Sequence, residues 1–478
     1  MVFGVRLRTV IFFLLVQLLA FIYNPMSEES ENNTADVDVA VVDRVDASTI
    51  QGKFMMGYQG WFFCGGDGAP VDPGHHGWIH WINQPLANDG NVSFDLWPST
   101  RELDDDELYE IPGLTIPADP TDPTSTPRPA RLFSSRNPKT VNRHFRWMRE
   151  FDLPGVFLQR FLGEVNGGGS RMALRDEVTQ RVREAAEKEG RVFANMWDLS
   201  GVPGDKIEQN IKDDWLHMIN DEKILESPSY LHEDGRPVIA IWGMGFADRG
   251  LDPDSLIRMI QWLRQSVPTG VWIMAGTPTY WNRAMEDQDP NPDFAKVWKE
   301  VDAISPWAVG RFGDLDGADG YHEDKTIRDM EIIQNEDQDR PGGPRDYIPV
   351  VFPGFSWKNL HGGPLNEISR QGGRFLYRQL YNTHQSNARC IYGAMFDEYD
   401  EATALMPAEV HKSRVPTERP FLSLDADGDT DIPDNWYLRI CALSSRALKS
   451  GQQLPEEFPR DFLFGKSLRE AARTHDEL

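Results

Sequence analysis

Eight short apolar runs recur along the chain from residue 50 onward, each followed by Gly, Pro or aromatic residues and then by a polar or amphipathic stretch. The runs are Phe54–Phe63, Val156–Phe161, Val192–Leu199, Val238–Phe246, Val271–Trp281, Ala303–Val309, Ile348–Trp357 and Ile391–Glu398. Their apolar residues are continuous, which is typical of parallel strands covered on both faces. Helix-like segments lie between them, at Val141–Phe151, Ala173–Glu189, Pro253–Gln265 and Gln371–Thr383. This alternation predicts an α/β fold, a (β/α)8 TIM barrel.

A doubly wound parallel sheet is the alternative, but no G-x-G-x-x-G follows the first run, so the dinucleotide fingerprint of that fold is missing. Two long segments interrupt the repeat, Pro85–Arg136 after strand one and Gly310–Tyr347 after strand six. Loops that follow barrel strands rise on the catalytic face. We therefore expect both segments to be long insertions on that face.

The ends of the chain differ from its middle. Residues 1–25 combine Arg6 and Arg8 with the 14-residue apolar run Val10–Tyr23, which is shorter than the roughly 20 residues of a membrane-spanning helix. We expect a signal peptide or a short uncleaved anchor, and hence a periplasmic, extracellular or outward-facing anchored protein. Residues 26–49 predict an acidic linker, 50–412 the barrel, and 413–478 a C-terminal extension packing on the barrel, with an acidic turn and a frayed tail.

The charge of the chain restricts its partners. Lys and Arg number 49 and Asp and Glu 75, so the net charge is −26, which argues against nucleic acid or an anionic membrane as a partner. A membrane partner is expected only if the N-terminal segment stays uncleaved. The three cysteines are too few for a disulfide framework, and we interpret them as small buried hydrophobes in preference to a thiol nucleophile.

Tryptophan gathers where a barrel places its site. Function in barrels lies at the carboxyl ends of the strands, and six of the eight predicted strand ends carry Trp, more than core packing alone explains. We therefore predict a carbohydrate cleft with a polysaccharide or oligosaccharide as ligand. The predicted substrate-binding residues are Trp61, His80, Arg160, Asp198, Trp242, Tyr280, Trp281, Trp307, Trp357 and Tyr399. For Arg160, an interior salt bridge is the alternative to binding an acidic or sulfated sugar.

The last run ends in four carboxylates within five positions, Asp397, Glu398, Asp400 and Glu401. They cannot all be ionised in a closed pocket without a raised pKa, and such a shift lets one carboxyl serve as an acid and its neighbour as a base. On a helical turn Glu398 and Glu401 would have Cβ atoms about 5–6 Å apart, which suits a retaining glycosidase pair. A solvated acidic turn or a metal site is the alternative.

Several motifs in order resemble the glycoside hydrolase family 71/99-like proteins, a group often labelled xylosidase/arabinosidase. They are GYQGWF at 57–62, GVFLQRFLG at 155–163, AIWGMGF at 240–246, GTPTYW at 276–281, ISPWAVGR at 304–311, VVFPGFSWKNL at 350–360 and AMFDEYDEATAL at 394–405. The resemblance covers about residues 50 to 445. The better understood relative is family 99, the endo-α-mannosidases and endo-α-mannanases, which are (β/α)8 barrels.

In family 99 the strand-eight motif reads Asn-Glu-Trp-His-Glu-Gly, and here the stretch is Asp397 to Ala402. Both glutamates match, so the resemblance implies that Glu398 removes the proton of a sugar 2-hydroxyl, which attacks the anomeric carbon to give a 1,2-anhydro sugar. It implies that Glu401 protonates the leaving oxygen and then activates water. The other four positions depart from the motif, which leaves the substrate open.

Function and cofactors follow as expectations. We expect an exported glycosidase that cleaves α-linked mannose-type glycans with retention, and we expect no obligatory cofactor and no metal. The alternatives are an α-glucanase or a pentosidase (xylosidase/arabinosidase), and a non-catalytic carbohydrate-binding barrel. Calcium is a further alternative at Asp425, Asp427, Asp429 and Asp431, although the EF-hand pattern is not matched. His75, His76 and His80 lack a matching metal motif.

Overall fold

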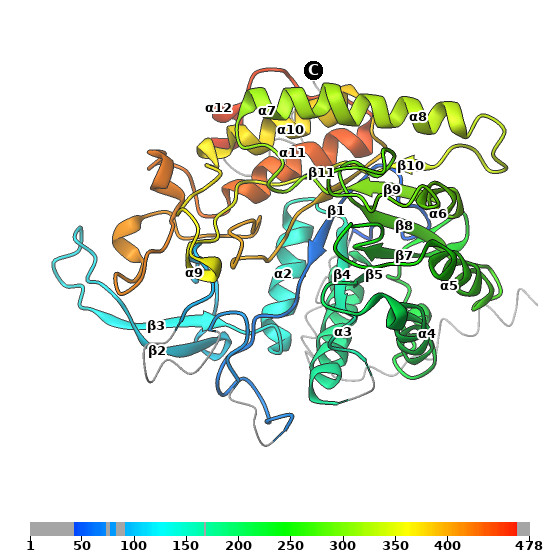
Figure 1. The fold of residues 1–478 in the computed structure, drawn as a ribbon. Coiled ribbons are helices and arrows are strands. Elements are labelled where there is room, and N and C mark those ends of the chain that lie inside the picture. Colours follow the sequence, from blue (N-terminus) through cyan, green and yellow to red (C-terminus); the bar gives the residue numbers. More distant parts are fainter. Residues whose placement is uncertain (1–42, 73–76, 83–90, 167–168, 466–478) are drawn as a thin grey trace, which may run out of the picture. The chain divides into compact units, whose positions relative to one another are not determined.

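Parallel strands follow one another around a barrel in the computed structural model (Figure 1). Its described residues are 43–72, 77–82, 91–166 and 169–465, and within them the barrel has eight strand positions. These are β1 (Lys53–Tyr58), β4 (Gly155–Phe161), β5 (Val192–Asp198), β7 (Arg236–Trp242), β8 (Trp272–Thr277), β9 (Ala303–Pro306), β10 (Asp346–Tyr347) with β11 (Val350–Val351), and β12 (Cys390–Gly393). β10 pairs with β9 and β11 with β12, so the segment 346–351 closes the barrel. The predicted (β/α)8 fold is confirmed, with one apolar run at each position.

Side chains alternate along each strand between the barrel interior and the layer beneath the helices, because successive residues of a strand point to opposite faces. On β1, Met55 packs in the interior cluster, whereas Phe54 and Met56 pack outward. Gly57 takes the next interior position, where a Cβ would lie 2.0 Å from the methyl carbon of Met395. This alternation decides which strand-end side chains reach the mouth of the barrel.

Helices cover the outside of the barrel. They are α2 (Pro138–Glu150), α3 (Ser170–Glu189), α4 (Gly204–Asn220), α5 (Pro253–Gln265), α6 (Phe294–Glu300) and α10 (Arg374–Gln385). The four helices predicted from the sequence all form. α5 begins where the pattern places it, because the Asp252 carboxylate accepts the backbone N–H of Ser255 at 2.9 Å and caps the first turn. Short elements link these units: η3 (Ile224–Glu226), β6 (His232–Glu233), α9 (Lys358–His361) and η5 (Gln371–Gly373).

The two predicted insertions take different forms. The first, as far as it is described, holds η2 (Asp105–Glu107) and an antiparallel hairpin of β2 (Leu108–Ile116) and β3 (Arg128–Phe133), which stands apart from the barrel strands (Figure 1). The second is mostly helical, with α7 (Leu315–Tyr321), η4 (His322–Ile327) and α8 (Arg328–Glu336) in succession. Since these helices connect β9 to β10, the second segment supplies the barrel's own helix at this position.

The chain beyond β12 packs against the barrel. It contains η6 (Lys412–Arg414), η7 (Leu424–Asp427), α11 (Trp436–Ser450) and α12 (Arg460–Phe464). The indole N–H of Trp436 donates to the carbonyl of Gly372 at 2.8 Å, and the Ser445 hydroxyl donates to the carbonyl of Asp152 at 2.7 Å. α11 therefore contacts the segment before α10 on one side and the turn after α2 on the other.

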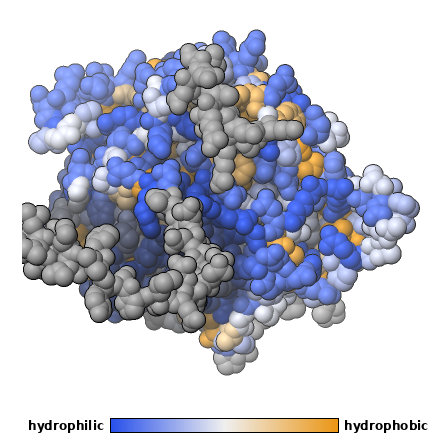
Figure 2. Space-filling view, turned by 180° about the vertical axis from the view of Figure 1, so that it is seen from behind, coloured by the Kyte–Doolittle hydropathy of each residue, from blue (hydrophilic) through white to orange (hydrophobic). Residues whose placement is uncertain are grey.

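The predicted signal segment, most of the predicted acidic linker and residues 466–478 lie outside the described residues. In the part of the chain that is described, no helix has the length and apolar character needed to cross a bilayer. The three cysteines are buried and free, as small hydrophobes would be. Figure 2 shows one face of the molecule, on which hydrophilic residues dominate and hydrophobic ones form small separate patches.

Candidate active site

The acidic motif follows β12 as a turn against the end of β1. The turn is closed by the Ala402 N–H, which donates to the carbonyl of Tyr399 at 3.1 Å. The two oxygens of the Asp397 carboxylate accept the backbone N–H groups of Gln59 at 2.7 Å and Gly60 at 2.9 Å. Because β12 pairs with β1, these bonds tie the motif to the carboxyl end of the first strand.

The two glutamates lie on this turn in different surroundings. Both oxygens of Glu398 accept hydrogen bonds, from the Gln59 side-chain amide at 3.0 Å and the Thr403 hydroxyl at 3.1 Å. Donors to both oxygens favour the charged form of a carboxylate. Glu401 is half-buried; burial and then the Asp400 charge raise its pKa, the nearby Trp357 indole lowers it, and the Asp198 carboxylate raises it further. Glu398 is thus the member of the pair with hydrogen-bond donors on both oxygens.

The motif is a cluster of carboxyl groups that retain protons. Burial is the largest cause in every case: it raises the pKa of Asp397 to about 7 and those of Asp400 and Glu401 to about 8. The pKa of Glu398 is raised well above its usual value, by burial and then by the charges of Glu401 and Asp400, against which the hydrogen bond from Thr403 acts. Among the described residues, no Arg or Lys forms an ion pair with any of the four. The cluster therefore holds protons near neutral pH.

A histidine from the segment after β1 reaches this cluster. Nδ1 of His80 lies 3.0 Å from Oδ2 of Asp400. The His80 ring is stacked on Trp61, with ring centroids 3.7 Å apart and planes 9° from parallel, and the ring of Phe161 is stacked on Trp61 at 4.7 Å. Aromatic rings thus already pack on Trp61, which makes it part of the wall of the mouth and a poor platform for a sugar.

Other predicted residues stand at the mouth with part of their surface free. Trp242 ends β7 and Trp307 follows β9; their rings cross edge to face at 5.2 Å, and both are half-buried, as is Trp357 after β11. Asp198 ends β5, and burial raises its pKa. The predicted Trp242, Trp307, Trp357 and Asp198 are therefore brought to the same end of the barrel as the glutamate pair.

Buried polar atoms without a partner are frequent at this end. They are Gln59 Oε1, Trp61 Nε1, Gln159 Oε1, Trp242 Nε1, Trp357 Nε1 and Asp400 Oδ1. Buried polar groups are nearly always hydrogen-bonded, so each such atom needs an explanation. Three are N–H donors and three are acceptor oxygens, and sugar hydroxyls, which both donate and accept, match that mixture.

Three predicted substrate contacts are wrong, because their side chains are committed elsewhere. Arg160 is fully buried and its guanidinium pairs with Asp214 of α4 and with Asp176 of α3, so the salt-bridge alternative is the one observed. Trp281 donates its indole N–H to Asp329 at 2.9 Å. Tyr399 is fully buried and donates its hydroxyl to the carbonyl of Pro407 at 2.7 Å. None of these side chains faces the mouth.

Tyr280 lies at the outer rim after β8. Its half-buried ring is covered by the Lys325 ammonium, 3.6 Å from the ring centroid, and by the guanidinium of Arg283 at 5.8 Å. These cations cover the face of the Tyr280 ring on which the sequence predicts a bound sugar.

The sequence reasoning missed the amide and hydroxyl residues of the site. Gln59 and Thr403 hold Glu398, and the side-chain amide of Gln159 donates to the hydroxyl of Tyr392 at 3.4 Å. The signal was available in the alternation of β4, where Phe157 is interior and Arg160 is outward. Counting in steps of two from Phe157 places Gln159 and Phe161 at the mouth.

The acidic turn after η7 directs its carboxylates to separate protein donors. Asp425 accepts the Lys412 N–H, Asp427 accepts the Gln371 N–H, and Asp429 and Asp431 accept from Arg460. No three of these four offer ligand atoms to a common centre within the described residues. Of the three histidines weighed as metal ligands, His75 and His76 lie outside the described residues.

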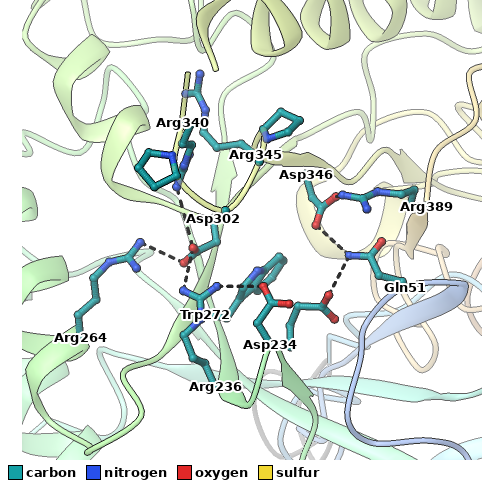
Figure 3. Close-up of a pocket in the computed structure, with 15 residues that line it drawn as sticks. Gln51, Asp234, Arg236, Arg264, Trp272, Asp302, Arg340, Arg345, Asp346 and Arg389 are labelled. Carbon is teal, nitrogen blue, oxygen red and sulfur yellow. Dashed lines mark hydrogen bonds and ion pairs between the residues drawn. The ribbon is translucent and has the colours of Figure 1, made fainter. Parts of the chain in front are cut away.

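A pocket of about 350 Å³ opens at the opposite end of the strands (Figure 3). Asp302 accepts there from the Arg236 and Arg264 guanidinium groups, each at 3.0 Å, and from the N–H of Ile273. The other charged residues that line the pocket are Glu233, Asp234, Arg340, Arg345, Asp346 and Arg389. Each of the arginines forms an ion pair, Arg345 with Glu336 and Asp337 and the others with carboxylates of the pocket, which favours a structural role for this pocket.

The fold matches solved glycoside hydrolase structures. Two structures of the GH99 endo-alpha-mannosidase from Bacteroides thetaiotaomicron, one with BIS-TRIS-propane, align with a TM-score of 0.56 at 14% identity, covering 84% of this chain and 99% of theirs. This chain shares the fold of these two structures. A glycoside hydrolase-like protein aligns with a TM-score of 0.45 at 15% identity, covering 72% of this chain and 90% of its own. No family model matches the sequence, and no curated protein matches it. The predicted relationship to family 99 is thus confirmed as a likeness of fold.

Proposed function

We propose that the protein is an exported glycoside hydrolase that cleaves α-linked mannose-type glycans with retention and without an obligatory cofactor. One observation carries this proposal: Glu398 and Glu401 lie on one turn in the mouth of the barrel, among carboxyl groups whose pKa values burial raises. The fold, shared with an endo-alpha-mannosidase, supports the mannose-type substrate. The apolar run Val10–Tyr23 after two arginines supports export.

The geometry fits distinct roles for the two glutamates. The donors on both oxygens of Glu398 act against the burial and the neighbouring charges that raise its pKa, which supports Glu398 as the base that takes the proton of the sugar 2-hydroxyl. The freed oxygen attacks the anomeric carbon as its bond to the leaving oxygen breaks, and Glu401 gives that oxygen a proton. Water then opens the 1,2-anhydro sugar: Glu401 takes a proton from the water, and Glu398 returns its own to the 2-oxygen. A pKa of about 8 lets Glu401 hold the proton it must donate at neutral pH.

The walls of the mouth suit a polyol. The half-buried rings of Trp242 and Trp307 offer apolar surface for the C–H faces of a sugar. Gln59, Gln159 and Asp400 each retain a buried acceptor oxygen without a partner. Bound hydroxyl groups would satisfy these atoms, and binding would then be selective because leaving them unpaired costs free energy.

The test is a screen of α-mannans, α-glucans and pentose polymers, followed by Glu398→Gln and Glu401→Gln on the responsive glycan. Each amide keeps the shape of the side chain but loses the proton chemistry, so we expect kcat to fall by about 10³-fold with the fold intact. Proton NMR of the first product should show the retained anomer. Asp234→Asn, an exposed carboxylate at the opposite end, is the control that keeps full activity.

Two outcomes would contradict the proposal. Full activity in either glutamine variant would remove the assigned roles. Glycan binding with no product after long incubation of the wild type would favour a non-catalytic carbohydrate-binding barrel.

A further inference from the structure

The contact between His80 and Asp400 joins two segments that are 320 positions apart in the chain. Asp400 is only 2% exposed, and its second oxygen, Oδ1, has no partner. His80 is held from two further sides, by the stack on Trp61 and by the Ser93 hydroxyl, which donates to its carbonyl. The stack on Trp61 thus holds the ring and the Ser93 hydroxyl holds the backbone, while Nδ1 faces Asp400.

We propose that His80 and Asp400 share one proton as a neutral pair, and that this pair tunes the pKa values of the two glutamates by keeping a further negative charge away from them. The inference rests on the proposed function. At position 400 the resemblance to family 99 leads to the expectation of His, but this chain has Asp400. A histidine from the segment after β1, His80, lies against this carboxyl group instead.

The charge of the pair is the same wherever the proton sits. With the proton on Asp400, both side chains are neutral; with it on His80, the two charges cancel. In either state, the pair adds no net charge beside Glu398 and Glu401. A lone ionised Asp400 would add a full charge to both, and a carboxylate beside another in a buried site raises its pKa.

Burial is the largest influence on the pKa of His80, and the charged groups around it act in both directions. Arg175 and Arg171 of α3 lower the pKa of His80, Glu164 of the segment after β4 raises it, and burial adds to the lowering, so that the pKa falls to about 3. The groups that face Asp400 are Asp397, Glu398 and Glu401 of its own turn. From β5, Asp198 faces Glu401. These surroundings place the shared proton mainly on Asp400.

The chain offers a matched replacement for His80. Asn carries a nitrogen at the same number of bonds from the backbone as Nδ1, so His80→Asn can still donate to Asp400 but cannot accept the shared proton. Asn also tolerates the left-handed backbone of this position, where φ is 60°. Asp400→Asn removes the carboxyl group, and the double variant removes both members of the pair.

The experiment compares the pH dependence of kcat/KM in the wild type and the three variants. In the wild type His80 accepts the carboxyl proton, whereas Asn donates to the carboxylate and favours its charged form; Asp400 therefore becomes charged at a lower pH in His80→Asn, and we expect both limbs of the profile to move up by about one pH unit. In Asp400→Asn and in the double variant, no such charge exists, so both limbs should stay at their wild-type positions. Unmoved limbs in His80→Asn, or an equal shift in the double variant, would overturn the proposal.

A second measurement needs no substrate. In ¹⁵N-histidine-labelled protein, the Nδ1 resonance of His80, assigned from its loss in His80→Asn, should move by several ppm in Asp400→Asn. If no glycan is cleaved but this resonance moves, the pair exists and the proposed function fails. If glycans are cleaved and the resonance does not move, the function stands and the pair does not exist. Thermal melts of all variants check that each is folded.

Discussion

The two ends of the barrel treat charge in opposite ways. At the N-terminal end, five arginines and four carboxylates line one pocket (Figure 3), and each arginine forms an ion pair with a carboxylate of the pocket or, for Arg345, with Glu336 and Asp337. At the carboxyl end, four carboxyl groups lie together, and no Arg or Lys of the described chain forms an ion pair with them. Paired charges hold a fold together, whereas buried carboxyl groups without a cation must keep protons. The comparison therefore separates structural charges from those available for chemistry.

The largest effect is expected where a paired charge is fully buried. Asp214 and Arg160 are both inaccessible to solvent and bond through two oxygens. Asp214→Asn would leave the buried guanidinium of Arg160 without the negative charge of this partner. We expect a loss of about 3–5 kcal/mol in the free energy of unfolding, measured by denaturant titration. The KM of the folded fraction should not change. A raised KM with unchanged stability would contradict this account and would indicate that Arg160 contacts the substrate.

The next effect tests the N-terminal pocket itself. Asp302 is shared by Arg236 and Arg264 and also accepts a backbone N–H. Asp302→Asn should lower the free energy of unfolding by about 2–3 kcal/mol. Asp234→Asn, whose carboxylate is 71% exposed and 3.5 Å from Arg236, is the matched control and should change it by less than about 0.5 kcal/mol. Equal losses in the two variants would show that the pairing around Asp302 does not stabilise the fold.

Removing a carboxyl group at the mouth of the barrel should raise the free energy of unfolding, whereas removing Asp302 lowers it. The pKa of Glu401 is raised from 4.5 to about 8. The unfolded chain therefore releases this proton first, and stability falls as pH rises from about 4.5 to about 8. Glu401→Gln does not titrate at this position, so it should match the wild type at pH 5 and exceed it at pH 8 by about 1–3 kcal/mol. Chemical denaturation at both pH values measures this, and a destabilised variant at pH 8 would contradict it.

The smallest effect concerns the tryptophans. Trp242 is half-buried at the mouth, whereas Trp281 is 1% exposed and bonded to Asp329. Trp242→Phe should raise KM by about tenfold, a loss of about 1.4 kcal/mol in binding. Trp281→Phe should lower the melting temperature and leave KM unchanged. If both variants change KM equally, the separation of these two residues is wrong.

The fold was predictable because its signals are local and repeated. Each continuous apolar run gave one strand position, and Asp252 with Pro253 marked a helix start that the structure reproduces. The Gly- and Asp-rich beginning of the second insertion predicts a long loop, and the structure differs from that prediction. Further along, Met330 and Ile333 are spaced as on a helix and pack against the core, and this part of the segment is helical.

The site was only partly predictable, because neighbouring side chains at the end of a strand point to opposite sides of the barrel wall. Gln159 and Arg160 are neighbours in sequence, yet the first is bonded to the interior Tyr392 and the second to helices outside the barrel. Composition at the strand ends could not separate them, whereas alternation counted from a known interior residue could. The His80 contact joins distant segments and left no local signal.

One measurement tests the difference between the two ends most directly. It is the hydrolysis rate per folded molecule of Glu398→Gln and of Asp302→Asn on the same glycan. We predict that Glu398→Gln is folded and about 10³-fold slower than the wild type. We predict that Asp302→Asn is less stable but cleaves at the wild-type rate once the folded fraction is counted. An active Glu398→Gln, or an Asp302→Asn that is stable and inactive, would place the chemistry away from the mouth and contradict the account.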